Sequence, residues 1–185
     1  MVRPIITPPD SRLRTKSKSI TKIDKRIKGI IQDLKDTLSA QVDPEGVGLA
    51  AVQIGKNEQI FLMRFSAKDA KSHGETEREK IVINPKIISI DKLTKLEQKS
   101  KKEILEGCLS IPHYYGPLVR SGKVTLEYMD ESGKTKTQTF TGFPAQVVLH
   151  EVDHLNGVLF IDRLLEQGKK LYEHTADDEW IEVEI

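Results

Sequence analysis

The first regular pattern of hydrophobic positions begins at Ile20, where apolar residues recur at intervals of three or four as far as Leu38. Lys, Asp and Arg fill most of the positions between them. This spacing predicts an amphipathic helix of about 20 residues whose apolar stripe packs into the core. Ser19 or Thr21 is suited to cap its start. Residues 1–19 contain three prolines and are expected to form an extended or irregular arm.

Later in the chain, several segments have the short apolar pattern of β-strands. The clearest is a hairpin, in which residues 123–130 and 134–141 flank a turn that contains Gly133. Residues 142–156 return to helical spacing, with Pro144 in the first turn. Further strands are expected at residues 59–65, 81–90, 93–105 and 180–185, and a loop at residues 66–80.

This order of elements predicts an α+β fold, in which antiparallel β-sheets pack around a central helix at residues 142–156. The helix that starts at Ile20 would be an additional long N-terminal helix. No repeat or linker divides the chain, so residues 1–185 are expected to form one domain. We expect a soluble, cytoplasmic protein, because 31% of residues are charged and no signal peptide or membrane-length apolar run is visible.

Charge is unevenly distributed, although the net charge is only +1. Residues 1–30 hold nine Lys and Arg against two Asp and Glu, whereas residues 173–185 hold six acidic residues and no Lys or Arg. A basic segment of this kind can contact an anionic surface such as RNA. Because no aromatic residues interleave with the charges, a solvated face is the preferred interpretation.

The strongest chemical signal is His150-Glu151-Val152-Asp153-His154 on the predicted second helix. Four residues make about one helical turn, so both imidazoles project from one face and can bind one metal ion. Glu151 would lie close enough to take a proton from a metal-bound water. The alternative is a helix surface that carries two histidines and two carboxylates by chance.

A catalytic metal site usually has a third protein ligand. His174 lies in an acidic tail that we expect to be frayed, and His73 lies in the predicted loop, so both are poor candidates. Cys108, in the turn-forming segment Glu106-Gly107-Cys108-Leu109-Ser110, is the better one, because a thiolate suits Fe(II) or Zn(II). As the only cysteine, Cys108 cannot form an intrachain disulfide. The alternative to a metal ligand is a small buried side chain in the core.

Three segments together resemble the peptide deformylase family, in the family's order. They are residues 46–53 (Gly-Val-Gly-Leu-Ala-Ala-Val-Gln), residues 106–110 and residues 150–154, within a resemblance that spans about residues 4–165. The resemblance implies removal of the formyl group from the N-terminal formyl-methionine of new polypeptides. It implies one divalent metal ion, Fe²⁺ first and Zn²⁺, Ni²⁺ or Co²⁺ as alternatives, with attack by metal-bound water and Glu151 as general acid and base.

The resemblance also implies roles for single residues. The metal ligands would be Cys108, His150 and His154, and the Gln53 amide with the Leu109 backbone N–H would stabilise the oxyanion. Gly48 would let an extended peptide approach, since it has no side chain. Apart from the resemblance, a methionine side chain needs an apolar pocket, for which Val47, Phe143 and Val147 are candidate walls. From their placement in the sequence alone, Glu106, Arg120 and Asp153 are candidate groups that orient the ligands.

Departures from the family leave some questions open. His113-Tyr114-Tyr115 stands where many relatives carry a glycine or a basic residue, which would alter the residues accepted after methionine. The C-terminal end lacks the long basic helix of some members, so ribosome association is expected to be transient at most, and no membrane or specific nucleic-acid partner is expected. The rival functions are a metallopeptidase and an inactive deformylase-like binding protein.

Overall fold

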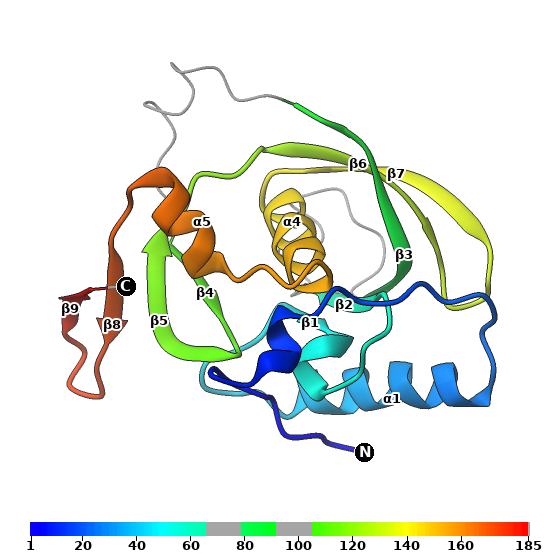
Figure 1. Ribbon diagram of the computed structural model, residues 1–185, viewed down its shortest axis with the longest axis horizontal. Helices are drawn as coiled ribbons and strands as arrows, with labels where there is room; N and C mark the ends of the chain where they lie inside the picture. Colours follow the sequence, from blue (N-terminus) through cyan, green and yellow to red (C-terminus); the bar gives the residue numbers. More distant parts are fainter. Residues whose placement is uncertain (66–78, 92–104, 185) are drawn as a thin grey trace.

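The computed structural model describes residues 1–65, 79–91 and 105–184 (Figure 1). Within them the fold is α+β, with two antiparallel sheets and three α-helices. Two short 3₁₀ turns, η1 (Ser11–Arg14) and η2 (Ala51–Ile54), precede the second strand. No helix in these ranges has the length and apolar character needed to cross a membrane.

The larger sheet has five strands in the order β1-β2-β3-β6-β7. Both of its faces are covered, because consecutive side chains of its buried strand β2 enter different cores. Phe61 and Met63 pack with the helix α4, while Ile60 and Leu62 pack with the helix α1. The bounds are β1 (Gly48–Ala50), β2 (Ile60–Arg64), β3 (Glu79–Ile90), β6 (Lys123–Met129) and β7 (Thr135–Thr141).

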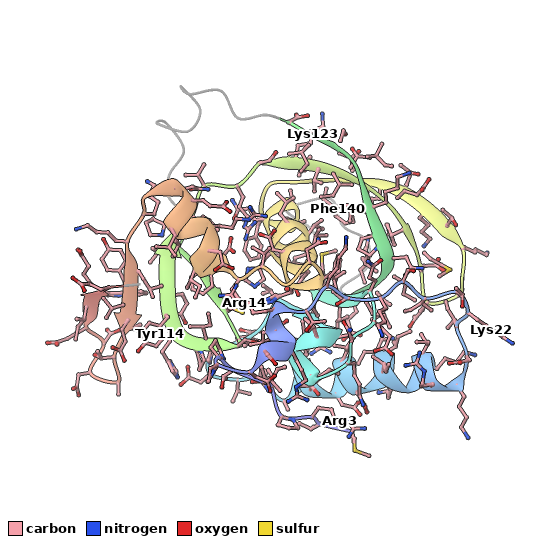
Figure 2. All side chains as sticks on the ribbon, in the orientation of Figure 1. Arg3, Arg14, Lys22, Tyr114, Lys123 and Phe140 are labelled. Atoms are coloured by element: carbon pink, nitrogen blue, oxygen red, sulfur yellow. The ribbon has the colours of Figure 1, made fainter. Side chains whose placement is uncertain are left out.

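The expected hairpin is confirmed, since β6 pairs with β7 antiparallel from Lys123↔Thr141 to Met129↔Thr135. Its inward residue Phe140 is fully buried in the core shared with α4 (Figure 2). The strands expected at residues 59–65 and 81–90 are present as β2 and β3. The strand expected at 93–105 lies almost wholly outside the described residues, as does the expected loop at 66–80 apart from its last two residues, which begin β3.

The helix α1 (Lys25–Ser39) begins five residues later than the periodicity predicts. The predicted caps Ser19 and Thr21 are wrong, because the Asp24 carboxylate accepts the N–H of Ile27 and caps the helix. Ile20 is instead bound to a distant side chain: its N–H donates to Asn84 Oδ1 at 2.8 Å, and Asn84 Nδ2 donates to its carbonyl at 2.6 Å. This long-range pair keeps Ile20 out of the helix.

The smaller sheet has four strands in the order β4-β5-β8-β9, and the helix α5 (Phe160–Gln167) covers one of its faces. The sequence patterns predicted β9 but missed α5, β5 and β8. The expectation of a frayed tail around His174 is wrong, because His174 pairs with Trp180 in the β8–β9 ladder. The bounds are β4 (Leu105–Cys108), β5 (Ile111–Pro117), β8 (Leu171–His174) and β9 (Trp180–Val183).

The helix α4 (Phe143–Leu155) forms where the spacing at residues 142–156 predicts it, with Pro144 in its first turn. Gly157 ends it with φ +75°, and a Cβ there would lie 2.5 Å from the Arg14 carbonyl oxygen. Apolar residues of α4 pack on the five-stranded sheet, and Figure 1 shows the helix between the two sheets. The side of α4 that does not pack on the five-stranded sheet therefore faces the turn from β4 to β5.

Candidate active site

Three side chains that can bind a metal converge between α4 and the β4–β5 turn. His150 and His154 lie one turn apart on α4, and Cys108 ends β4. The distance from Cys108 Sγ to His154 Nε2 is 3.1 Å, and the two histidine Nε2 atoms are also 3.1 Å apart. All three ligand atoms lie within 4.8 Å of one another. The local motifs thus come together in space as one group.

The chemistry of this group fits a single divalent metal ion. His150 Nδ1 lies 2.7 Å from Glu106 Oε1, so we assign a proton to Nδ1, which makes Nε2 the atom that would bind a metal ion after losing its own proton. One thiolate and two imidazoles are a donor set that suits Zn(II) or Fe(II). Without a metal ion, the Cys108 sulfur and the two Nε2 atoms would have to share the few protons available between them.

A chain of ion pairs supports the histidines from behind. Arg120 binds both Glu106 oxygens, at 2.6 and 2.7 Å, and reaches Asp153 at 2.8 Å. Arg163 in turn binds Asp153 Oδ1 at 2.7 Å. Burial pushes the pKa of Glu106 upward, but His150 and Arg120 outweigh it and lower that pKa to about 2. Glu106 is therefore an anion that holds His150 in one orientation.

Glu151 is buried, with 2% of its surface exposed, on the side of α4 that faces β1. Burial raises the pKa of Glu151 to about 7. Its Oε2 atom has no hydrogen-bond partner among the described residues, while Oε1 lies against the backbone of Gly48. A Cβ at Gly48 would stand 2.2 Å from that oxygen, so only glycine leaves room for the carboxylate. The arrangement provides a proton acceptor at the pocket floor.

Gln53, at the end of η2, has its amide orientation fixed from both ends. Its Oε1 accepts the N–H of Ala50 at 2.8 Å, and its Nε2 lies 3.2 Å from Ser110 Oγ and 3.6 Å from Cys108 Sγ. The amide N–H group therefore points toward the metal-binding group. Leu109 lies in the turn that follows Cys108, between the paired residues Cys108 and Ile111.

These groups border a pocket of about 260 Å³. Every residue predicted as catalytic, substrate-binding or metal-binding lines it, except His154, which lies buried behind. The structure adds wall residues that the sequence did not single out. These are Pro44, Glu45, Gly46, Leu105, Gly107 and Gln146, together with His113, Tyr114 and Tyr115 from the noted departure.

The other described histidines, His113 and His174, are not part of the metal-binding group. His113 is exposed at the rim of the pocket, with φ +67°. His174 pairs with Asp178 at 2.8 Å on the C-terminal hairpin, and His73 lies outside the described residues. Two supporting residues were missed: Ser110 beside Gln53, and Arg163 beside Asp153. Ser110 is the last residue of the cysteine motif, whereas nothing in the local pattern marks Arg163.

The family model described as polypeptide deformylase matches residues 2–170. A peptide deformylase from Rhizobium meliloti is 38% identical over 161 residues, which is 87% of this chain and 84% of that protein. The crystal structure of a peptide deformylase from Ehrlichia chaffeensis superposes with a TM-score of 0.75 at 32% identity, over 89% and 88% of the two chains.

A Met-Ala-Ser-bound crystal structure of a class I type b peptide deformylase from Acinetobacter baumannii is also similar. Its TM-score is 0.73 at 26% identity, and the match covers 88% of this chain and 98% of that one.

Proposed function

The chain belongs to the polypeptide deformylase family, and on that premise we propose which of its residues carry out the reaction. The family is a group of hydrolases that remove the formyl group from N-formyl-methionyl peptides. One observation supports the assignment above all others: Cys108, His150 and the buried His154 form one group, and Cys108 and His150 line the same pocket as Glu151.

We propose that Cys108, His150 and His154 hold one divalent metal ion and that α4 is the central metal-binding helix. Fe²⁺ is our first assignment, and Zn²⁺, Ni²⁺ or Co²⁺ are alternatives, because the same donors accept all four. When bound, such an ion lowers the pKa of a coordinated water and polarises a carbonyl. Glu106 fixes the donor atom of His150, and Arg120 keeps Glu106 charged.

Glu151 is the proposed general base and acid. Its unpartnered Oε2 accepts the proton of the attacking water, and the same oxygen delivers that proton to the departing amine nitrogen. A carboxyl group with a pKa of about 7 can both accept and release a proton near neutral pH.

The developing oxyanion is proposed to accept hydrogen bonds from Gln53 Nε2 and the Leu109 backbone N–H. Ala50 and Ser110 hold the amide in place before the reaction, so little reorganisation is needed. One such donor is typically worth about 3 kcal/mol of transition-state stabilisation.

The substrate is proposed to enter as an extended strand beside Gly48, because β1 is an edge strand of its sheet. Val47, Phe143 and Val147 border the pocket and would surround the methionine side chain. The Acinetobacter relative has been crystallised with Met-Ala-Ser bound, which supports a methionyl peptide as the ligand proposed for this chain.

We also propose that residues 1–185 act as a single catalytic domain. Its substrates are nascent chains, so a transient encounter with the ribosome in the cytoplasm is the proposed setting.

The test is release of formate from formyl-Met-Ala by protein purified without oxygen, with metal content measured in parallel. We expect turnover by the metal-loaded protein, and none by Glu151→Gln with equal metal content. Acetyl-Met-Ala and casein serve as controls. Cleavage of casein would favour a metallopeptidase, and absence of formate release at full metal content would favour an inactive binding protein.

A further inference from the structure

The C-terminal hairpin of β8 and β9 follows the last residue matched by the family model, residue 170. It extends the smaller sheet beyond β5 (Figure 1). Tyr172 of β8 stands opposite Tyr115 of β5, and β9 is the outer strand. The hairpin therefore lies beside the segment that forms the pocket rim.

Tyr115 connects the pocket with this hairpin. The residue lines the pocket, and its ring covers Gly107 on the neighbouring strand. A Cβ at Gly107 would stand 2.6 Å from the tyrosine ring, which shows how closely the ring lies on that backbone. On its other side, the Tyr115 ring meets the edge of Trp180, with centroids 5.4 Å apart at 65°. One aromatic surface thus runs from the pocket rim to β9.

Trp180 is held in place yet remains open to solvent. Its ring stacks on His174, with centroids 4.5 Å apart and an interplanar angle of 24°. The His174 side chain is in turn paired with Asp178 at 2.8 Å. Nevertheless, 48% of Trp180 is exposed. Fixed and partly exposed aromatic rings lose little entropy on binding, which makes them typical recognition groups.

The two faces of this sheet differ. On one face, Leu164 of α5 packs against Gly116 and closes the sheet off. Tyr115, Tyr172, His174 and Trp180 alternate onto the other face, because paired residues share a side of the sheet. We call Tyr115, His174 and Trp180 the aromatic shelf.

We propose that the aromatic shelf binds the part of the substrate that follows formyl-methionine, and that it favours apolar or aromatic side chains there. The proposal rests on the proposed function, which places methionine in the pocket. A peptide that leaves the pocket passes Tyr115, which belongs to both surfaces.

Kinetics with short and long substrates test the proposal. The substrates are formyl-Met-Ala, formyl-Met-Ala-Phe-Ala and formyl-Met-Ala-Asp-Ala, and the variant is Trp180→Ala. We expect its KM for the phenylalanine peptide to rise about three- to tenfold, the range set by one lost aromatic contact. The kcat of the variant for the phenylalanine peptide should stay within about twofold of wild type, because the shelf does not contact the reacting atoms. Its kcat and KM for formyl-Met-Ala should also stay within about twofold, because this short substrate does not reach the shelf.

Ile181→Ala is the matched control. Ile181 is 45% exposed on the same strand, but its side chain points to the opposite face. Ile181→Ala should leave kcat and KM unchanged for all three substrates. Trp180→Phe should retain most of the preference for the phenylalanine peptide over the aspartate peptide. Equal loss on the short and long peptides, or no loss on either, would overturn the proposal. If Trp180→Ala does not fold, Trp180→Leu is measured instead, with the same two criteria.

Fluorescence gives an independent readout, because Trp180 is the only tryptophan. Adding the product peptide Met-Ala-Phe-Ala to the metal-loaded enzyme should shift the emission to shorter wavelength and saturate, whereas Met-Ala should not. A saturable effect of equal size with both peptides, or none with the longer one, would contradict the proposal. Failure of the proposed function is distinct, since it would abolish turnover of formyl-Met-Ala itself.

Discussion

Replacing Gly48 by alanine tests the contact between β1 and the proposed catalytic carboxylate. An added Cβ would lie 2.2 Å from Glu151 Oε1 and 3.1 Å from Val147 Cγ1. An ordinary carbon–oxygen contact needs about 3.3 Å, so the carboxylate has to retreat by about 1 Å. A shift of that size at a reacting group costs about 100-fold in rate. We therefore expect kcat to fall about 100-fold, equivalent to about 2.7 kcal/mol of transition-state stabilisation.

The fold should tolerate the methyl group, because the nearest atom is the end of a flexible side chain beside a pocket. The free energy of unfolding should drop by about 1 kcal/mol, the low end for overpacking. The assay is formate release from formyl-Met-Ala at saturating substrate, with metal content and thermal melting measured on the same sample.

Gly29→Ala is the control for this substitution. Gly29 is exposed on α1, and an added Cβ there meets nothing within 4 Å. It should leave kcat unchanged and stabilise the protein by about 0.5–1 kcal/mol, since alanine favours helix. If Gly48→Ala kept more than half of wild-type kcat at full metal content, the position assigned to Glu151 in the reaction would be wrong.

Three further predictions concern the groups behind the metal ligands. In the metal-free protein, the ionised form of Glu106 contributes stability fully above about pH 4.5, its ordinary pKa, and loses it as pH falls toward 2. Urea midpoints should therefore drop more steeply with acid for wild type than for Glu106→Gln, and parallel curves would refute this. Arg120→Ala leaves Glu106 without its cation, so metal affinity in chelator competition should fall about 10- to 100-fold; unchanged affinity in a folded variant would contradict it. Burial opposes protonation of His150, but Glu106 and Cys108 raise its pKa well above the usual range, so metal binding must displace a proton and should strengthen as pH rises. Titration calorimetry in two buffers of different ionisation enthalpy would detect that proton, and a buffer-independent enthalpy would argue against it.

The sequence predicted the parts of this molecule that depend on local spacing. Two histidines four residues apart on a helix must share a face, so His150 and His154 could be paired without the structure. Cys108 was added because a thiolate suits Fe(II) or Zn(II) and the other histidines were poor candidates, and the family resemblance then implied the same ligand. The β6–β7 hairpin was equally local, since a glycine turn fixed its register.

Features that depend on distant contacts were missed. The start of α1 is set by Asn84, more than 60 residues away, which binds the backbone of Ile20. The strand β5 contains Pro112, Gly116 and Pro117, a composition typical of turns, and it is a strand because β4 and β8 pair with it. Arg163 joins the ion pairs behind the metal ligands only through the packing of α5.

The candidate metal ligands come from two separately packed parts of the molecule. Cys108 belongs to the four-stranded sheet, whereas both histidines belong to the helix packed on the five-stranded sheet. An ion held by all three is therefore a cross-link in a chain that has no disulfide. By mass action, free metal at 1,000 times its dissociation constant would add about 4 kcal/mol to the stability of the native state. Oxidation of the Cys108 sulfur would remove that cross-link together with activity, so an oxidised molecule would also unfold and be degraded more readily.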